Sequence, residues 1–317
     1  MTTSTSSMLS TSSNEPTGSL SAAQRQTADA FALKWSKRDT FDSPESRARA
    51  RAWLVERYGD VAEAEWWDDY GDAPVVLDAG CGAGFAALEL LGPRLDRIRY
   101  LGVDASRAVE VARARFAEGG HAAAFLRSDI TSLPLPAASV DVILAEGVLH
   151  HTDNAEAAFH ALVPLLRDGG RFLFYVYRRK GPIREFTDDY LRDKLRALSP
   201  QEGWDALLPL TRLGQQLGDM DVTLDLPDGI PLLDVPPGPI TLQRFVYWHV
   251  FKAFHHPDLD IDELNHINYD WYAPANASRH TPEEVREWCA SAGLAIERER
   301  VEEAGITVVA TRPAGAG

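Results

Sequence analysis

VVLDAGCGAGF, residues 75–85, joins a β-branched apolar run to three closely spaced glycines. A run of this kind is typical of a buried strand, and AALELL after it begins a helix. Glycines at a turn from strand to helix let the backbone approach a ligand, and a helix N-terminus favours a carboxylate or phosphate. The stretch therefore predicts a strand, a ligand-binding turn and a helix. A purely structural turn has the same glycines, so the neighbouring sequence must decide.

Short apolar runs alternate with helical stretches beyond this turn. Four further strand candidates precede the end of the alternation: RYLGVDAS (99–106), AAFLRSDI (123–130), VDVILAEGV (140–148) and RFLFYVY (171–177). Strands separated by helices imply a parallel sheet covered on both faces, which is a doubly wound, Rossmann-like α/β fold.

The rest of the sequence forms separate segments before and after this core. About 100 residues after Tyr177 show no clear period and are too long for an unstructured loop, so we expect an inserted lid that binds the acceptor. TPEEVREWCASAGL has a capping box at Thr281 and Glu284, and two strands follow it. The expected divisions are a disordered tail (1–22), a helical cap (23–73), the core (74–177), the lid (178–280) and a last helix with two strands that complete the core (281–317).

Composition limits the partners and the compartment. The formal net charge of -15 is spread along the chain and disfavours a phosphate backbone, so we expect no nucleic-acid partner. No apolar run approaches the roughly 20 residues that span a bilayer, so no membrane partner is expected. Two cysteines, Cys81 and Cys289, form no ligand-like spacing, and the N-terminus has no signal-peptide pattern. A cytoplasmic location is the resulting prediction.

Acidic residues follow three of the predicted strands. Asp104 ends the second strand about 20 residues after the glycines, where a carboxylate can bind both ribose hydroxyls. Asp129 ends the third strand and Glu146 the fourth. Ligands of such sheets bind beyond the carboxyl ends of the strands, so we expect these acids to surround one crevice.

With these residues the sequence resembles the class I methyltransferases that use S-adenosylmethionine. The motif Asp78-Ala79-Gly80-Cys81-Gly82-Ala83-Gly84 matches their glycine motif, and AEGVLHHT matches their segment after the fourth strand. The resemblance implies a seven-stranded sheet that ends in an antiparallel hairpin, and an N-terminal segment, FALKWSKRDTF, that closes over the donor. The donor-binding residues it implies are Asp78, Gly80, Gly82, Gly84, Asp104, Ala105, Asp129, Ile130 and Glu146.

Two other functions compete with methyl transfer. An NAD-dependent oxidoreductase shares the fold, but its turn normally reads G-x-G-x-x-G without a leading acid, so Asp78 and Gly84 disfavour it. A catalytically inactive, methyltransferase-like scaffold subunit is the second, and the intact pair Asp78 and Asp104 disfavours it. The predicted activity is methyl transfer to carbon or oxygen of a small-molecule acceptor, and an anionic metabolite is one option.

Acceptor residues are expected beyond the strand ends and in the lid. His151 follows the fourth strand, and Asp270 and His280 lie in NHINYDWYAPANASRH (265–280), so these three are the catalytic candidates. The substrate-binding candidates are Tyr177, Arg178, His266 and Trp271.

Three roles for the late stretch remain open. One is a divalent metal held by His151, Asp270, His280 and His266, since imidazole and carboxylate suit such ions. The second is a metal-free acid–base or orienting role for Asp270 and His280. The third is a structural role, in which both residues only bond the lid to the sheet.

Overall fold

A computed structural model describes residues 20–37 and 43–315, so almost all of the predicted disordered tail lies outside the described residues. Its centre is a seven-stranded sheet of order β3-β2-β1-β4-β5-β9-β8. The strands are β1 (Val75–Ala79), β2 (Arg99–Asp104), β3 (Ala123–Arg127), β4 (Val140–Ala145), β5 (Leu166–Tyr177), β8 (Ala295–Val301) and β9 (Gly305–Thr311). The first five pair in parallel, whereas β9 is antiparallel to both β5 and β8. The predicted sheet with an antiparallel last hairpin is confirmed.

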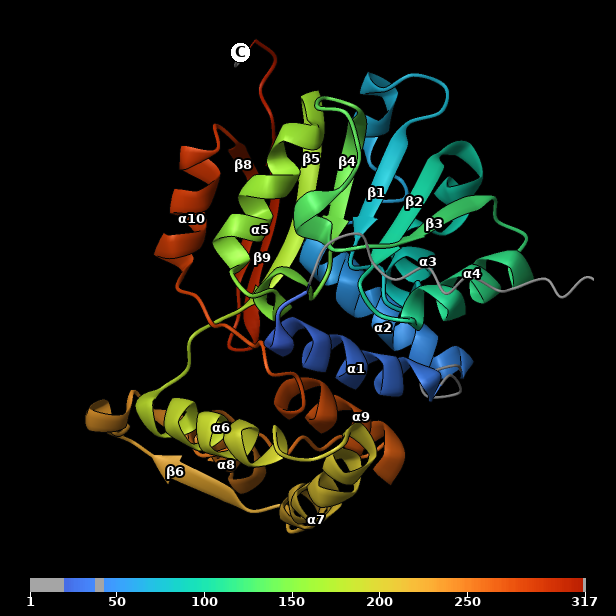
Figure 1. Ribbon diagram of the computed structural model, residues 1–317. Helices are drawn as coiled ribbons and strands as arrows, with labels where there is room; N and C mark the ends of the chain where they lie inside the picture. The colour runs from blue at the N-terminus through green and yellow to red at the C-terminus, as the bar shows by residue number, and fades with distance from the viewer. Residues whose placement is uncertain (1–19, 38–42, 316–317) are drawn as a thin grey trace, which may run out of the picture.

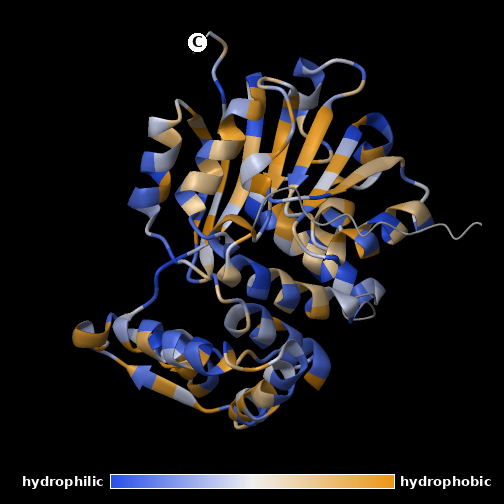
Figure 2. Cartoon of the chain, in the orientation of Figure 1, coloured by the Kyte–Doolittle hydropathy of each residue, from blue (hydrophilic) through white to orange (hydrophobic). Residues whose placement is uncertain are grey.

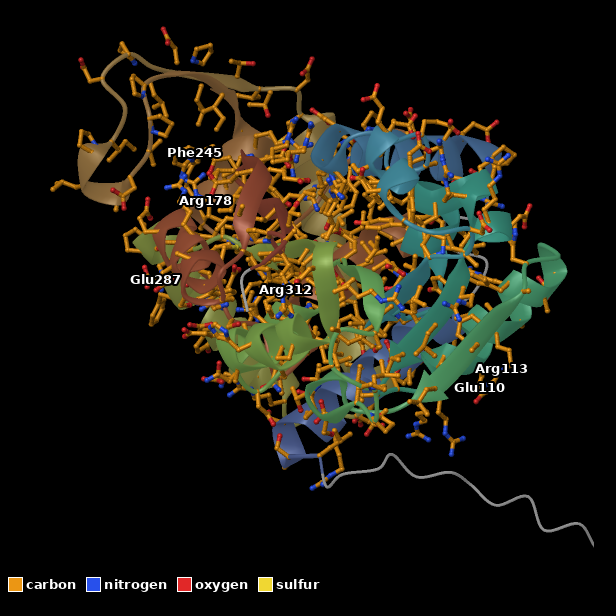
Figure 3. All side chains as sticks on the ribbon, turned by 90° about the horizontal axis from the view of Figure 1, so that it is seen from above. Glu110, Arg113, Arg178, Phe245, Glu287 and Arg312 are labelled. Atoms are coloured by element: carbon orange, nitrogen blue, oxygen red, sulfur yellow. The ribbon has the colours of Figure 1, made fainter. Side chains whose placement is uncertain are left out.

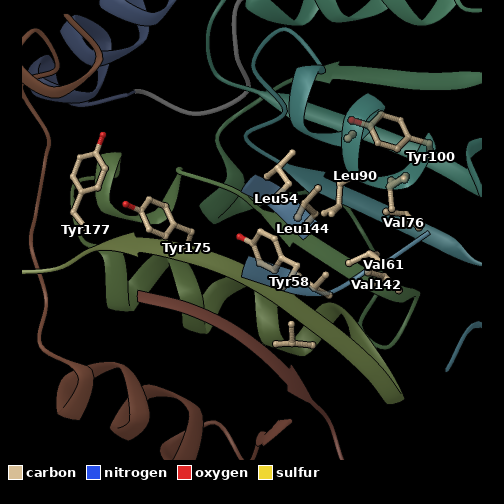
Figure 4. Close-up of a cluster of buried hydrophobic side chains, with 14 of the residues drawn as sticks. Leu54, Tyr58, Val61, Val76, Leu90, Tyr100, Val142, Leu144, Tyr175 and Tyr177 are labelled. Carbon is tan, nitrogen blue, oxygen red and sulfur yellow. The ribbon is translucent and has the colours of Figure 1, made fainter. Parts of the chain in front are cut away.

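Alternate residues of β5 face the two sides of the sheet, as the period of two in a strand requires. Phe172 and Phe174 pack among α5 (Ala155–Leu162) and α10 (Pro282–Ser291). Tyr175 and Tyr177 belong to the opposite cluster, whose buried side chains Figure 4 shows. The central strands are apolar along their length, because helices cover both faces (Figure 2).

Four N-terminal helices contribute buried side chains to the cluster on the face of the sheet that carries Tyr175 and Tyr177. They are α1 (Ala22–Ser36), α2 (Pro44–Tyr58), α3 (Phe85–Leu91) and α4 (Ala108–Glu118). Ser21 and Ser43 cap α1 and α2 by accepting hydrogen bonds from backbone amides, and Pro44 occupies the first turn of α2. Helix α1 contacts α4 of the core and α7 and α9 of the lid, so it lies between the sheet and the lid (Figure 1).

The segment between β5 and α10 is folded into a lid. It contains α6 (Pro182–Leu195), α7 (Pro200–Asp219), β6 (Thr223–Leu226), β7 (Gly238–Thr241), α8 (Leu242–His249) and α9 (Ile261–Tyr272). The sequence showed no clear period here, yet α7 and α9 each begin with a capping box, Ser199 with Glu202 and Asp260 with Glu263. The lid lies below the carboxyl ends of the parallel strands (Figure 1), on the side of the sheet where ligands bind.

The centre of the lid is a buried ion pair. Arg184 Nε donates to both oxygens of Asp188 at 3.0 and 2.9 Å. Trp271 Nε1 and the Tyr272 hydroxyl donate to the same carboxylate at 2.7 and 3.0 Å. Asp188 thereby connects α6 to α9. The Arg184 side chain is fully engaged in this pair and is buried.

Among the described residues, no helix has the length and apolar character needed to cross a membrane.

Candidate active site

A cavity of about 290 Å³ lies between the carboxyl ends of the parallel strands and α1. One end carries most of the predicted donor-binding residues. Those that line it are Asp78, Gly80, Gly82, Asp104, Ala105, Asp129, Ile130 and Glu146. The other end is lined by residues of α1 and the lid and by His151.

The glycine turn is packed too closely for side chains. Gly80 and Gly82 have φ of 86° and 50°, a region that L residues rarely adopt. A Cβ on Gly80 would lie 2.3 Å from Cγ1 of Val148, and one on Gly82 would lie 2.9 Å from Nε1 of Trp35. Gly84 differs, because it packs against Phe116 of α4 and is not among the residues that line the cavity. Gly84 was predicted to bind the donor, but it lies where α3 meets α4.

Asp104 holds the turn against β2. One carboxylate oxygen accepts from the Gly82 amide at 2.9 Å, and the other accepts from the amide and hydroxyl of Ser106 at 2.7 and 2.6 Å. Burial raises the pKa of Asp104, although these three bonds favour the ionised form. Each oxygen has a further lone pair, so the carboxylate can still accept bonds from a ligand.

Asp78 lies at the end of β1, below the turn. The Tyr100 hydroxyl donates to it at 2.6 Å. Burial raises the pKa of Asp78 to about 7, and the hydrogen bond from Tyr100 offsets only part of that rise. Near neutral pH, this carboxyl therefore changes charge inside the cavity.

Glu146 directly follows β4 and bonds to the last turn of α2. The Tyr58 hydroxyl donates to it, and Arg57 Nη1 lies 3.3 Å away. The Arg57 guanidinium is stacked between the rings of Trp53 and Tyr175, with centroids 3.5 and 3.9 Å from Cζ. Burial raises the pKa of Glu146 despite the positive charge of Arg57.

At the opposite end, an ion pair connects α1 to the lid. Lys34 Nζ donates to Asp270 of α9 at 2.5 Å, and the Tyr177 hydroxyl donates to the other oxygen at 3.1 Å. Burial opposes ionisation of Asp270, but the charge of Lys34 and its hydrogen bond outweigh burial and hold the pKa of Asp270 well below the usual range. Asp270 is therefore a carboxylate at physiological pH.

His151 lies between this ion pair and the donor end. Its Nδ1 is 2.7 Å from the carbonyl oxygen of Asn276, which can only accept, so Nδ1 carries the proton and Nε2 has the free lone pair. Phe31 packs edge-on against the ring, with centroids 4.8 Å apart. Burial lowers the pKa of His151 to about 4, against the opposing effect of the Asp270 charge. The ring is therefore neutral at pH 7.

Four predicted acceptor-side residues are not among those that line the cavity. His280 Nε2 is 2.9 Å from the Ser278 hydroxyl, and Nδ1 is 3.7 Å from Glu284. His266 packs edge-on against Trp35 and Trp204. His280 therefore does not line the cavity in which the predicted orienting role would be performed.

Arg178 and Trp271 are the other two. Arg178 donates to the carbonyl oxygen of Glu302 at 3.4 Å and lies 3.7 Å from Glu303. Figure 3 shows it on the side of the molecule that carries Phe245, away from Glu110 and Arg113 of α4. The Trp271 ring packs behind Tyr177, with centroids 4.4 Å apart. Tyr177 itself lines the cavity.

The hypothesis of a metal site finds no ligand set in residues 20–37 and 43–315, where no three His, Cys, Asp or Glu side chains are grouped to hold an ion. Asp270 is occupied by Lys34 and Tyr177 instead, and His266 and His280 face other neighbours.

Several residues of the site have no signal in the sequence. Lys34 and Phe31 lie in the segment expected to close over the donor, but nothing in their spacing indicates an ion pair with Asp270. Arg57 and Tyr58 lie at the end of α2, and the sequence of this helix indicates only that the helix is amphipathic, not that it contacts the site. Their roles depend on contacts between segments 88 or more positions apart in the chain.

The known proteins to which this chain is similar include methyltransferases. A family model described as a methyltransferase domain matches residues 77–174. A tRNA (carboxymethyluridine(34)-5-O)-methyltransferase of Xenopus tropicalis is 31% identical over 145 residues, 42% of this chain and 21% of that protein. Malonyl-[acyl-carrier protein] O-methyltransferase of Serratia marcescens is 31% identical over 138 residues, 44% of this chain and 49% of that protein. The chain thus spans between a fifth and about a half of the length of these two curated relatives.

Among solved structures, 1,6-didemethyltoxoflavin-N1-methyltransferase of Burkholderia thailandensis, with 1,6-didemethyltoxoflavin and S-adenosylhomocysteine bound, aligns over 94% of both chains with 15% identity and a TM-score of 0.46.

Residues 77–174 are a methyltransferase domain. Together with the sheet order and the glycine turn, this match identifies the domain as one of the class I S-adenosylmethionine-dependent methyltransferase type. The predicted family is confirmed.

Proposed function

We propose that this chain transfers the methyl group of S-adenosylmethionine to a small acceptor held between α1 and the lid. The observation that carries this proposal is the cavity between the carboxyl ends of the parallel strands and α1. Its donor end is built from the glycine turn and the strand-end acids, and its other end presents His151 and Asp270.

The charges of the cavity fit the donor. Asp78, Asp104 and Glu146 are carboxyls whose pKa burial raises, so all three gain from a nearby positive charge. S-adenosylmethionine supplies a methyl group on a positively charged sulfonium and also carries an ammonium. A dinucleotide would instead bring a negatively charged pyrophosphate to the same acids, so the fit disfavours an NAD-dependent enzyme.

In this proposal, residues of the glycine turn and of the strand ends bind different parts of the donor. Asp104 accepts bonds from the ribose hydroxyls, and the backbone of Gly80 and Gly82 lies against the methionine part. Ala105 and Ile130 enclose the adenine ring, with Asp129 at its edge. These roles rest on the family resemblance, and the position of each residue in the cavity lining supports them.

His151 is the proposed general base. The bond from Nδ1 to Asn276 leaves Nε2 as the nitrogen that accepts a proton from the acceptor. As the methyl group moves to the acceptor's nucleophile, that proton passes to Nε2. The ionised Asp270 then stabilises the imidazolium by its charge. The products are S-adenosylhomocysteine and the methylated acceptor.

A small acceptor fits better than a nucleic acid. Helix α1 covers the cavity and is bonded to the lid through Lys34 and Asp270. The net charge of -15 also opposes a phosphate backbone. One relative is named a tRNA methyltransferase, so tRNA is the rival acceptor that an assay must include.

Turnover to S-adenosylhomocysteine tests the function. The chain should bind the donor by calorimetry and form product with at least one member of a panel of 2-oxo acids, phosphorylated metabolites and phenols. Product with tRNA alone would overturn the small acceptor. Failure to bind the donor would leave the inactive scaffold as the better reading.

Donor affinity should depend on pH through Asp78. Because a cationic donor binds the ionised carboxyl more tightly, affinity should be level above pH 7 and fall below it, approaching tenfold per pH unit. Calorimetry from pH 5.5 to 8.5 measures this. The Asp78→Asn variant should bind more weakly and without the inflection. An unchanged inflection in Asp78→Asn would assign it to another group.

A further inference from the structure

One wall of the cavity is formed by helix α2, which contributes no residue to the predicted donor site. Ala50, Trp53 and Leu54 of this helix line the cavity. Positions 50, 53, 54 and 57 have the spacing of one helix face, so Arg57 continues the same face. Arg57 is not itself among the lining residues. The three lining residues (Ala50, Trp53 and Leu54), named here the α2 wall, therefore have a buried guanidinium beside them.

The order of the strands places the α2 wall beyond the donor. The donor-binding residues lie at the ends of β1, β2 and β3, whereas Glu146 follows β4 and Tyr175 lies in β5, on the other side of β1. The Tyr175 ring packs edge-on against Trp53 and Tyr177, with centroids 6.5 and 6.1 Å apart. Figure 4 shows the two tyrosines next to each other on β5. A row of aromatic rings thus extends from the α2 wall to the acceptor end.

Trp53 is exposed and yet held in place. Its exposed fraction is 45% although it lines the cavity, so the indole lies at the rim. Arg57 covers one face of the ring, with Cζ 3.5 Å from the centroid. The guanidinium also packs on Tyr175 and lies 3.3 Å from Glu146 and 3.5 Å from Glu302. A fixed and partly exposed indole is a surface on which an aromatic ring or a cation packs favourably.

Glu146 provides a hydrogen-bond acceptor in the same part of the cavity. The Tyr58 hydroxyl donates to one oxygen, and Arg57 Nη1 lies 3.3 Å from the other. Both partners belong to α2, and Glu146 itself lines the cavity. Each carboxylate oxygen has a further lone pair. An N–H or O–H group of a ligand in the cavity can therefore donate to Glu146.

The charged groups that line the cavity are mostly acids. Lys34 is the one cationic side chain of the described lining, and it is bound to Asp270 at 2.5 Å. Further cations, among them Arg57, Arg127 and Lys252, act on these acids from outside the lining. An anionic acceptor would find carboxylates and no free cation in the described lining. The lining acids are Asp78, Asp104, Asp129, Glu146 and Asp270.

We propose that the α2 wall, together with Glu146 and Tyr175, binds the acceptor, and that the acceptor is an aromatic compound without negative charge that carries an N–H or O–H group. This inference rests on the proposed function and specifies its substrate class. The ring packs against Trp53 and Tyr175, and the N–H or O–H group donates to Glu146. Arg57 is a positioning residue for both contacts, because it packs on the indole and pairs with the carboxylate.

Binding of four small probes to the whole chain, saturated with S-adenosylhomocysteine, tests the substrate class. The probes are phenol, benzylamine, benzoate and cyclohexanol, and saturation-transfer NMR measures the dissociation constant of each. We expect phenol or benzylamine to bind at least about threefold more tightly than benzoate and cyclohexanol, since an aromatic pair contributes this much. Tighter binding of phenol assigns an uncharged acceptor, and tighter binding of benzylamine assigns a cationic one.

Two results would overturn this substrate class. One is binding of benzoate or cyclohexanol that is as tight as that of the better aromatic probe. The other is no binding of either phenol or benzylamine.

Trp53→Leu tests where the probe binds. Leucine keeps an apolar side chain but removes the ring, so the dissociation constant of the better probe should increase at least about threefold. Glu146→Gln removes the charge that accepts the hydrogen bond and should weaken the same probe about tenfold. Phe186→Leu is the control, because this aromatic side chain of α6 is 73% exposed and does not line the cavity. Equal affinities in Trp53→Leu and the unmodified chain would exclude the α2 wall as the binding site.

The affinity for S-adenosylhomocysteine separates this inference from the proposed function. Calorimetry should give dissociation constants within about twofold for the unmodified chain, Trp53→Leu and Phe186→Leu, as for most substitutions at exposed positions. Intact binding of S-adenosylhomocysteine without the expected preference among the probes rejects the acceptor class alone. A chain that does not bind S-adenosylhomocysteine rejects the methyltransferase function.

Discussion

Asp188→Ala should lower the free energy of unfolding by about 3–5 kcal/mol, because it removes one partner of a buried ion pair and leaves the other charge unpaired. Asp188 is fully buried and accepts from Arg184, Trp271 and Tyr272, so these donors would also lose their acceptor. Urea unfolding monitored by circular dichroism measures the loss.

The same helix offers a matched control. Asp193 pairs with Arg196 three positions later at 2.9 Å, but both side chains are more than half exposed. Asp193→Ala should therefore cost less than about 1 kcal/mol. If the two alanine variants were equally stable, the Arg184–Asp188 pair would contribute no more than a surface pair.

His151→Asn should reduce kcat by about 100-fold to 10,000-fold, the usual contribution of a general base. An asparagine amide can still donate to the carbonyl oxygen of Asn276 in place of Nδ1, but it has no nitrogen that accepts a proton. Donor affinity should change little, because the acids that attract the donor are untouched. Steady-state kinetics with the acceptor found in the turnover panel, together with calorimetry of S-adenosylhomocysteine, measures both quantities.

His160→Ala is the control for His151. His160 lies on α5 with a side chain that is 37% exposed, and it does not line the cavity. Its replacement should leave kcat within about twofold, as for most surface substitutions. A kcat for His151→Asn close to that of the unmodified chain would show that the acceptor arrives without a proton to lose, as a carboxylate does.

The donor half of the site could be predicted because its signals are local. Asp78, Gly80 and Gly82 lie within five residues, and Asp104 and Glu146 end strands whose apolar runs are plain in the sequence. In a parallel sheet all such ends meet at one edge, so topology alone brings them together. Gly84 belongs to the same motif, but its packing partner on α4 depends on how two helices meet, which the motif does not specify.

The acceptor half could not be predicted in the same way. Lys34 and Asp270 are 236 positions apart, and their pairing depends on how α1 lies against the lid. His280 precedes the capped helix as expected, but its ring packs edge-on against Trp288 of that helix, with centroids 4.7 Å apart. A fixed position in the sequence did not determine the direction of the side chain. The capping boxes of α7 and α9 were readable signals that the irregular composition of the lid obscured.

The placement of α1 between core and lid has a consequence for how such enzymes diverge. The matched domain, residues 77–174, supplies the donor end and His151, whereas Phe31, Lys34, Tyr177 and Asp270 lie outside it. Two segments that are far apart in the chain could therefore be exchanged together while the methyl-donor machinery is inherited unchanged. New acceptors would then arise by paired replacement of the N-terminal helix and the lid, and exchange of either segment alone would leave a buried charge without its counterpart.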